Sequence, residues 1–233
     1  MSLLWRLLTH RAGDEALPDD IGEDPEPDEP ELPEPALAQA LYLRDEDFER
    51  AAATLNVDLA VIRAVAEVEA AGRGFLADGR PQILYEAHVF DRETQGRHRS
   101  VRDSRGKPLS VPAWDRTLYG AAGAWQHDGR LAPAASLNWT AAHRASSWGL
   151  FQIMGFNHRL VGHERIVDFV DAMVRGAGPH LDAFVAFIRA NRLDNALRSR
   201  DWREFARRYN GPAYERNNYH TKLEQAWRRF ANA

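Results

Sequence analysis

The sequence predicts a mainly α-helical fold with one small β-hairpin. Two observations support this class. After residue 45, apolar residues recur at helical spacing along most of the chain, and a single Asp78-Gly79 pair separates two short apolar runs. The predicted helix and hairpin meet in one stretch, Asp58 to His88, which also carries the main candidates for chemistry.

The first part of this stretch is predicted to be an amphipathic helix that ends in a carboxylate. At about 100° per residue, Val61 and Ile62 share the apolar face, and Glu69 falls among the residues of that face. The helix should end at Gly72 or Gly74, which leaves Glu69 in its last turn. Burial and the negative end of the helix dipole both raise the pKa of a carboxyl group there. Glu69 is therefore expected to keep its proton near neutral pH, as a general acid must.

The second part is predicted to be a β-hairpin that carries another carboxylate. Asp-Gly between apolar runs is a strong hairpin signal, so residues 75–77 and 82–87 should be its strands. Glu86 would then lie at a sheet edge that folds back toward the end of the helix. Two carboxylates in such different surroundings, one desolvated and one at a sheet edge, form the pairing used for glycoside hydrolysis. The alternative is a structural buried glutamate beside a surface glutamate.

Composition narrows the class of protein. The 233 residues are 44% hydrophobic, which is enough for one folded domain with one core. The chain has no cysteine, so the fold must hold without disulfides. Residues 1–36 carry 11 acidic residues against two arginines, whereas the remainder carries 23 acidic against 28 basic residues. A mildly basic body favours an anionic polymer such as the cell wall, with ordinary surface charge as the alternative.

The chain is predicted to divide into three parts. Residues 1–12 form an apolar peptide that is too short for a membrane span and unlike a signal peptide. It is either a docking or membrane-surface peptide or a partly ordered apolar terminus. Residues 13–36 are acidic, hold six of the 12 prolines and should form an extended linker. Residues 37–233 form the folded, catalytic domain.

Helical patterns account for most of the folded domain. Besides the helix that ends at Glu69, helices are predicted over residues 45–55, 112–126, 133–145, 161–174, 181–190, 193–199, 202–209 and 219–231. Residues 88–115 are polar and rich in arginine and should form loops beside a cleft. They lack interleaved aromatics, so no nucleic-acid partner is expected. No metal or cofactor is expected either, because the chain has no H-E-x-x-H, G-x-S-x-G, phosphate loop or dinucleotide fingerprint.

Two later motifs complete a known pattern, SSWGLFQIMGFNH at residues 146–158 and FARRYNGPAY at residues 205–214. A glutamate that ends a helix, followed by these motifs in order, resembles the lysozyme-like superfamily of muramidases and lytic transglycosylases. The segment before these motifs is similar to the N-acetylmuramidase family found in phage endolysins; its sequence is AEVEAAGRGFLADGRPQILYEAHVF. The resemblance covers roughly residues 45–233.

The resemblance implies a lysozyme-like fold whose hairpin lines the active-site cleft. It also implies cleavage of the β-1,4 bond between N-acetylmuramic acid and N-acetylglucosamine in peptidoglycan. In this scheme Glu69 protonates the leaving glycosidic oxygen, and Glu86 activates water or steadies the oxocarbenium-like transition state.

The family's pattern also suggests residues that bind the substrate. Gln152 is expected to face the glycan, and Ser147 of the same motif is expected to bind the substrate with it. The alternative for Gln152 is that its amide only ties down buried backbone. Tyr209 and Asn210 end a helix, where a phenol and an amide would reach the Glu69 carboxyl group or a sugar.

Three rival functions remain open at this point. A lytic transglycosylase needs one acid and adds no water, and a second carboxylate argues against it. A non-catalytic wall-binding or virion module is disfavoured by the intact Glu69, Gln152 and Tyr209. The third is a secreted antibacterial muramidase effector.

The biological setting also stays open. The partners expected are peptidoglycan strands, together with either a holin that releases an endolysin or a secretion apparatus and an immunity protein. We expect a monomer without a membrane span, made in the cytoplasm without a signal peptide and acting in the periplasm or cell wall of the target bacterium.

Overall fold

The computed structural model describes residues 41–70, 74–211 and 214–233. The predicted apolar peptide and acidic linker, residues 1–12 and 13–36, and the first four residues of the predicted domain lie outside the described residues. Within them no helix is both long and apolar enough to span a bilayer.

The described chain is mainly helical, as predicted. Its α-helices are α2 (Asp45–Leu55), α3 (Leu59–Glu69), α4 (Ala87–Glu93), α5 (Ala132–Ala135), α6 (Trp139–Arg144), α7 (Ile166–Arg175), α8 (Ala177–Ala190), α9 (Asp194–Arg198), α10 (Trp202–Asn210) and α11 (Tyr219–Ala231). Short 3-10 turns η2 (Arg116–Leu118), η4 (Gly155–Asn157) and η5 (Tyr214–Asn217) and the π-helix η3 (Gln126–Leu131) join them.

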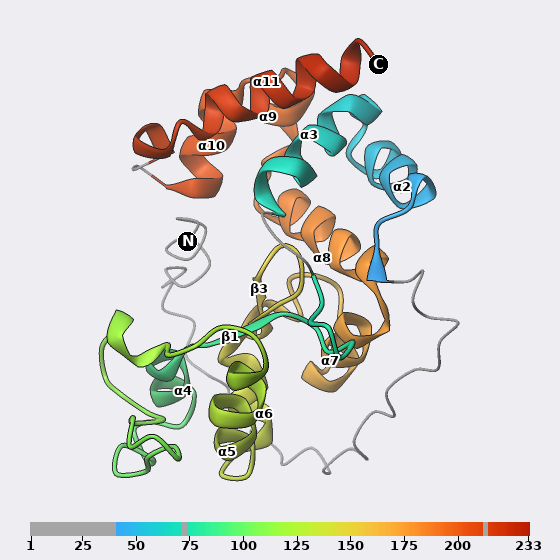
Figure 1. Ribbon diagram of the computed structural model, residues 1–233. Coiled ribbons are helices and arrows are strands. Elements are labelled where there is room, and N and C mark those ends of the chain that lie inside the picture. The colour runs from blue at the N-terminus through green and yellow to red at the C-terminus, as the bar shows by residue number, and fades with distance from the viewer. Residues whose placement is uncertain (1–40, 71–73, 212–213) are drawn as a thin grey trace.

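The helices form two groups that share α8. Figure 1 shows α3, α9, α10 and α11 together at the top, β1, α4, α5 and α6 below, and α8 between the two groups. Helix α11 packs along α3, and α2 packs against both α3 and α8. A stacked pair, Phe151 on Phe184 at 4.4 Å between ring centroids, ties α8 to the sheet side of the core. Because α8 contributes to both groups, one continuous hydrophobic core holds them together.

A three-stranded antiparallel sheet lies in the lower group. Its strands β1 (Ile83–Tyr85), β2 (Ser146–Trp148) and β3 (Ile153–Met154) run in the order β1-β2-β3. Ile83 pairs with Trp148, so the strand that precedes Glu86 is joined to a segment about 60 residues further along the chain.

The predicted hairpin is correct at its turn but wrong about its strands. The turn forms at Asp78-Gly79, where Gly79 takes a φ of 87° that favours glycine, and an isolated bridge joins Phe75 to Pro81. However, β1 has its ladder with β2, not with the run before the turn, and this long-range pairing lies where Ile83 and Tyr85 are buried in the core. Strand β1 also ends at Tyr85, so Glu86 lies beyond it.

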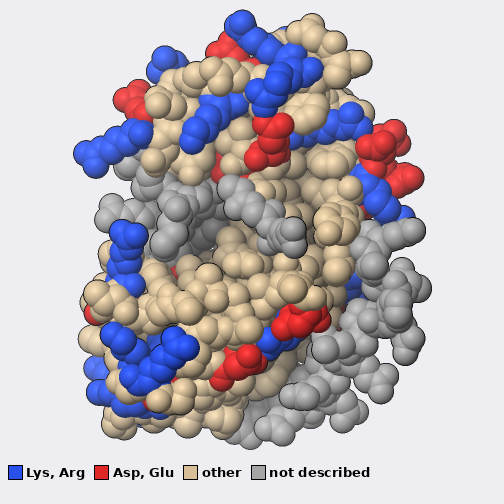
Figure 2. Space-filling view, in the orientation of Figure 1, with Lys and Arg blue, Asp and Glu red and all other residues tan. Residues whose placement is uncertain are grey.

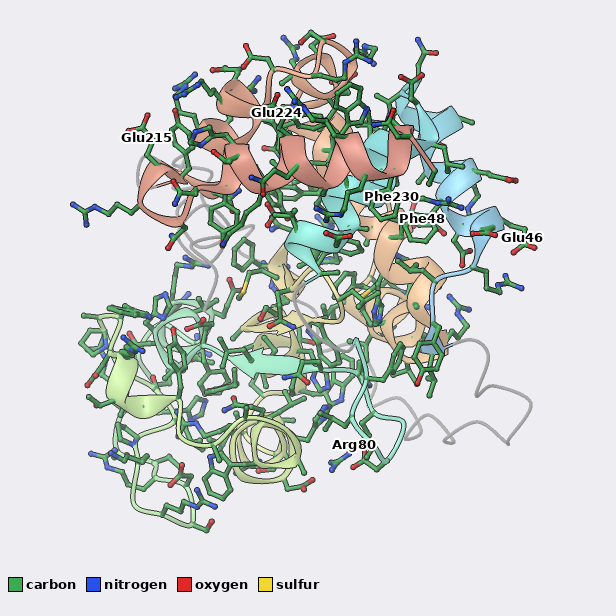
Figure 3. The ribbon with its side chains drawn as sticks, turned by 45° about the horizontal axis from the view of Figure 1, so that its top comes forward. Glu46, Phe48, Arg80, Glu215, Glu224 and Phe230 are labelled. Carbon is green, nitrogen blue, oxygen red and sulfur yellow. The ribbon has the colours of Figure 1, made fainter. Side chains whose placement is uncertain are left out.

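The π-helix η3 holds the turn and β1 in place. Arg80, labelled at the turn in Figure 3, donates hydrogen bonds to Asp128 of η3, the shorter at 2.5 Å. The Gln126 side chain accepts a hydrogen bond from the backbone N–H of Tyr85 at 3.1 Å. The segment that leads to Glu86 is therefore fixed from a second element as well as from the sheet.

The helix predicted over residues 112–126 is wrong. In the structure this stretch holds the three-residue turn η2, and helical residues begin again only at Ala124 and Trp125, directly before the π-helix starts at Gln126. Asp115 caps the turn by accepting hydrogen bonds from the backbone N–H and the hydroxyl of Thr117, both at 2.8 Å. The glycines at 120 and 123 take positive φ angles, which interrupts a continuous helix.

Candidate active site

Glu69 is the last residue of α3, and its side chain is buried. Only 6% of the residue is exposed, because its helix face packs with Val65 and Ile62 into the core. The helix ends one residue later, where the backbone N–H of Ala70 still bonds to the carbonyl of Ala66. The predicted helix end at residue 72 or 74 is thus slightly late, but the predicted place of Glu69 in the last turn is confirmed.

The Glu69 carboxyl group has one hydrogen-bond partner among the described side chains. Asn210, the last residue of α10, donates from Nδ2 to Glu69 Oε1 at 3.0 Å. The other oxygen, Oε2, is buried without a partner among the described residues. Burial raises the pKa of Glu69 to about 7, while the Asn210 hydrogen bond and the charge of Lys222 act in the opposite direction. Near neutral pH the group is therefore poised to hold or release a proton.

Tyr209 stands next to this pair but makes a different contribution. Its ring stacks on Phe205 and meets Phe184 edge-on, so it forms part of the core beneath the end of α10. Its hydroxyl is buried with no hydrogen-bond partner among the described residues. The structure thus brings Asn210 into contact with Glu69, as the resemblance implied, and shows no hydrogen bond from Tyr209.

Glu86 is fully buried, and its predicted place on a strand at a sheet edge is wrong. It precedes α4 as the N-cap residue, and 0% of its surface is accessible. The Tyr119 hydroxyl lies 2.9 Å from Oε2 and 3.1 Å from Oε1, and His88 Nδ1 lies 3.5 Å from Oε2. Burial raises the pKa of Glu86 to about 9, and the Tyr119 hydrogen bond opposes that rise only in part. The chain from Val111 to Tyr119 covers this carboxyl group, which local sequence periodicity does not predict.

A small pocket opens beside Glu86. Glu86, His88, Trp114 and Tyr119 are among its lining residues, and none of the lining residues comes from α3 or α10. Its volume is about 200 Å³ even with the space open to solvent included, which is small for a bound sugar polymer. The two acids therefore have separate partners: Glu69 bonds to α10, whereas Glu86 bonds to the segment before η3.

Gln152 and Ser147 contact each other and the sheet. The Ser147 hydroxyl donates to Gln152 Oε1 at 2.8 Å, and Gln152 Nε2 donates to the carbonyls of Gly149 and Gln82 at 2.8 and 3.3 Å. Gln152 also has a φ of 50°, which few side chains adopt at no cost. These contacts agree with the alternative that the amide ties down buried backbone, and the residue as a whole is partly buried.

Several residues of the site had no signal in the sequence. Tyr119 and Trp114 lie in the stretch that is predicted to be a helix, and Lys222 lies in a predicted helix far along the chain from Glu69. Tyr119 and Lys222 act on the acids, and Trp114 contacts Tyr119, from parts of the chain that are distant in sequence, so a local sequence pattern does not indicate them. Among the described residues no group of three or more His, Asp or Glu side chains is gathered as metal ligands would be.

Basic side chains gather in two places on one face of the molecule. In Figure 2 lysines and arginines cluster over the α10 and α11 side of the face and again at its lower left. An anionic polymer that lies across this face would meet favourable charge at both places.

Comparisons with known proteins agree with this chemistry. The family described as N-acetylmuramidase matches residues 58–231. The crystal structure of the Burkholderia AP3 phage endolysin is similar to this chain, with a TM-score of 0.75 and 42% sequence identity. The alignment covers 83% of this chain and 73% of that chain. Among curated proteins there is no match.

Proposed function

Since the chain belongs to the N-acetylmuramidase family, a group of peptidoglycan hydrolases, we propose that it cleaves the β-1,4 bond between N-acetylmuramic acid and N-acetylglucosamine. The observation that carries this proposal is the Glu69 carboxyl group. It is buried at a helix end, one oxygen is held by Asn210, and the other oxygen has no partner among the described residues.

Glu69 is the general acid of this reaction. The N–H of Asn210 can only donate, so it marks Oε1 as the acceptor oxygen and leaves the carboxyl proton to Oε2. A pKa of about 7 keeps much of that proton in place at neutral pH and still lets it transfer to the glycosidic oxygen. Proton transfer lets the carbon–oxygen bond break as positive charge develops on the muramic ring.

Glu86 is the second carboxyl group. In its ionised form it would take a proton from the attacking water or stabilise the charge on the ring. Burial raises its pKa to about 9, so its ionisation at neutral pH requires a change in its surroundings when the glycan binds. The covering segment around Tyr119 is where such a change has to occur, because its hydroxyl contacts both carboxyl oxygens.

The burial of Glu86 also favours a second candidate, a lytic transglycosylase. A protonated Glu86 cannot activate water, and the muramic acid's own hydroxyl would then attack to form a 1,6-anhydro ring. Only Glu69 would be needed. The two reactions differ in their products, so one digestion separates them.

Digestion of purified sacculi with mass spectrometry of the products tests both candidates. Hydrolysis gives reducing ends and takes up heavy oxygen from labelled water, whereas transglycosylation gives anhydro ends without label. We expect reducing ends, with no product from Glu69→Gln and a rate at least ~100-fold lower from Glu86→Gln. Glu67→Gln is the matched control, because Glu67 lies on the exposed face of the same helix and pairs with Arg229. Product release by Glu69→Gln at the wild-type rate would refute the assignment.

The biological role follows from the same family. We propose that the protein lyses bacteria from the cell-wall side as a monomeric enzyme of the phage endolysin type, with a secreted effector as the alternative. An endolysin needs a holin or another route to the wall, whereas an effector has an immunity partner. Expression with and without a holin, followed by culture turbidity, distinguishes them: lysis that depends on the holin supports the endolysin, and protection by a neighbouring gene supports the effector.

A further inference from the structure

A line of hydrogen bonds joins the surface to the buried Glu86. Trp114 Nε1 donates to Tyr119 Oη at 2.5 Å, and Tyr119 Oη lies within 3.1 Å of both oxygens of Glu86. We propose that Trp114 is a sugar-stacking residue of the glycan site and that Tyr119 is a positioning residue, so that a glycan on Trp114 favours the ionised form of Glu86. The inference rests on the proposed function, because it takes Glu86 as the second carboxyl group of the reaction.

The direction of these hydrogen bonds is set by the indole group. An indole N–H can donate but cannot accept, so the Tyr119 oxygen must be the acceptor for Trp114. The Tyr119 proton is then directed to Glu86, whose carboxyl oxygens accept it. Donation to a carboxyl group favours its ionised form. Donation by Trp114 also polarises the Tyr119 hydroxyl and makes it a stronger donor.

The exposure of the three side chains falls in steps along the line. Trp114 is 43% exposed, Tyr119 is 9% exposed and Glu86 is fully buried. Among the described residues the exposed large hydrophobic side chains are Tyr42, Trp114 and Leu137, and of these Trp114 lines the pocket at Glu86. An indole at the mouth of a pocket offers a broad apolar face, which suits the apolar face of a pyranose ring.

Other charged and titratable groups around Glu86 do not replace Tyr119. Tyr85 and Arg130 line the same pocket, but Arg130 is paired with the buried Asp103 at 2.9 Å. His88 Nδ1 on α4 lies 3.5 Å from Oε2. Asp115 lines the pocket from the covering segment, and its carboxylate accepts hydrogen bonds from Thr117. Tyr119 is the hydroxyl that contacts both carboxyl oxygens.

Glycan binding on Trp114 would act on Glu86 through this geometry. A sugar stacked on the indole restricts the motion of the Trp114 side chain and so maintains the hydrogen bond from its N–H to the Tyr119 hydroxyl. The carboxylate form of Glu86 is then favoured at the moment when a substrate is present. This coupling supplies the change that a buried second carboxyl group needs before it can serve the reaction.

The first experiment separates stacking from hydrogen bonding. Binding of an N-acetylglucosamine tetramer is measured by calorimetry in the Glu69→Gln background, which prevents cleavage. We expect Trp114→Ala to weaken binding about tenfold, a typical loss for an aromatic contact, and Trp114→Phe to stay within about threefold because it keeps an aromatic face. Tyr42→Ala removes an even more exposed aromatic that does not line the pocket, and this variant should bind as the parent does. Equal affinity for Trp114→Ala and its parent would overturn the stacking role.

The second experiment follows Glu86 directly. An infrared pH titration of the intact protein, with Glu86→Gln as the reference that lacks this carboxyl band, gives the midpoint of Glu86. We expect Tyr119→Phe and Trp114→Phe both to raise this midpoint, and the tetramer to lower it in the otherwise unchanged protein but not in Tyr119→Phe. Folding is checked by circular dichroism for each variant. A midpoint that is the same in Trp114→Phe and wild type would overturn the positioning role.

The proposed function and the inference about Trp114 and Tyr119 can be refuted separately. Turnover of sacculi by Glu69→Gln refutes the proposed function, whatever Trp114 does. If Glu69→Gln is inactive while Trp114→Ala binds and Trp114→Phe titrates as wild type, the proposed function stands and only this inference fails.

Discussion

Asn210 at the end of α10 donates a hydrogen bond of 3.0 Å to Glu69 at the end of α3, 141 positions earlier in the sequence. Two helix ends therefore meet at one carboxyl group. The bond engages one oxygen, and burial affects the whole group, so the acid is both oriented and kept near a pKa of about 7.

The first prediction concerns the orientation of the acid. Replacing Asn210 with alanine removes a donor that favours the ionised form, so the pKa of Glu69 should rise further above 7. In the profile of kcat against pH, the alkaline limb should move to higher pH. The value of kcat should fall about tenfold, because the carboxyl proton is less well oriented toward the glycosidic oxygen. Asn232→Ala, an exposed asparagine at the end of the chain, serves as the control. An alkaline limb at its wild-type position would contradict the predicted role.

The second prediction is the pH dependence of the wild-type enzyme. A general acid must carry its proton, so kcat should fall as the pH rises through about 7. Glu86→Gln should lower the rate but leave this limb in place, because Glu86 has other hydrogen-bond partners than Glu69. Initial rates on sacculi in buffers of constant ionic strength give the profile. A rate that keeps rising above pH 8 is incompatible with Glu69 as the acid.

A third prediction links the same group to stability. The pKa of Glu69 is about 7 in the folded chain and near its ordinary value of 4.5 when the chain is unfolded, so the folded state binds more protons between these values. Its contribution is fully present below pH 4.5 and is lost as the pH rises through 7. Glu69→Gln cannot ionise and should therefore be more stable than wild type at pH 8.5 by on the order of 2–3 kcal/mol, with little gain at pH 4.5.

Urea denaturation at the two pH values measures this difference. Glu67→Gln, on the exposed face of the same helix, should show no such dependence. An equal effect of Glu69→Gln at both pH values would mean that the buried carboxyl group does not titrate as described.

The fourth prediction distinguishes the two roles considered for Gln152. Its amide makes three hydrogen bonds to the sheet and the β2–β3 turn, and its φ is 50°. Gln152→Ala should lower the free energy of unfolding by about 2–4 kcal/mol, because three hydrogen bonds to partly buried groups are lost. Ser147→Ala removes one of these bonds and should cost about 1 kcal/mol. An unchanged melting temperature with a raised KM would instead identify Gln152 as a substrate contact.

Local patterns in the sequence were sufficient for much of this protein. The helices α2 and α11 lie where apolar periodicity predicts them, at residues 45–55 and 219–231. The buried place of Glu69 in the last turn of α3 also follows from helical spacing. These features depend on neighbours a few residues apart, so a short window of sequence contains their cause. The turn at Asp78-Gly79 belongs to the same class, since its geometry depends on one dipeptide.

Tertiary structure alone decided the surroundings of the two acids. Glu69 meets Asn210 from 141 positions away, and Glu86 is closed off by Tyr119, 33 positions away, in a stretch that sequence reasoning assigned to a helix. Strand β1 pairs with β2, so the hairpin strand expected beside the turn is replaced by one about 60 residues later. Burial, and with it the pKa of each carboxyl group, depends on what packs above the residue and not on its neighbours in the chain. The sequence by itself therefore indicated the two candidate acids and the place of Glu69 in the last turn of its helix. The packing of distant segments decided how deeply each carboxyl group is buried, and with it how far its pKa is raised.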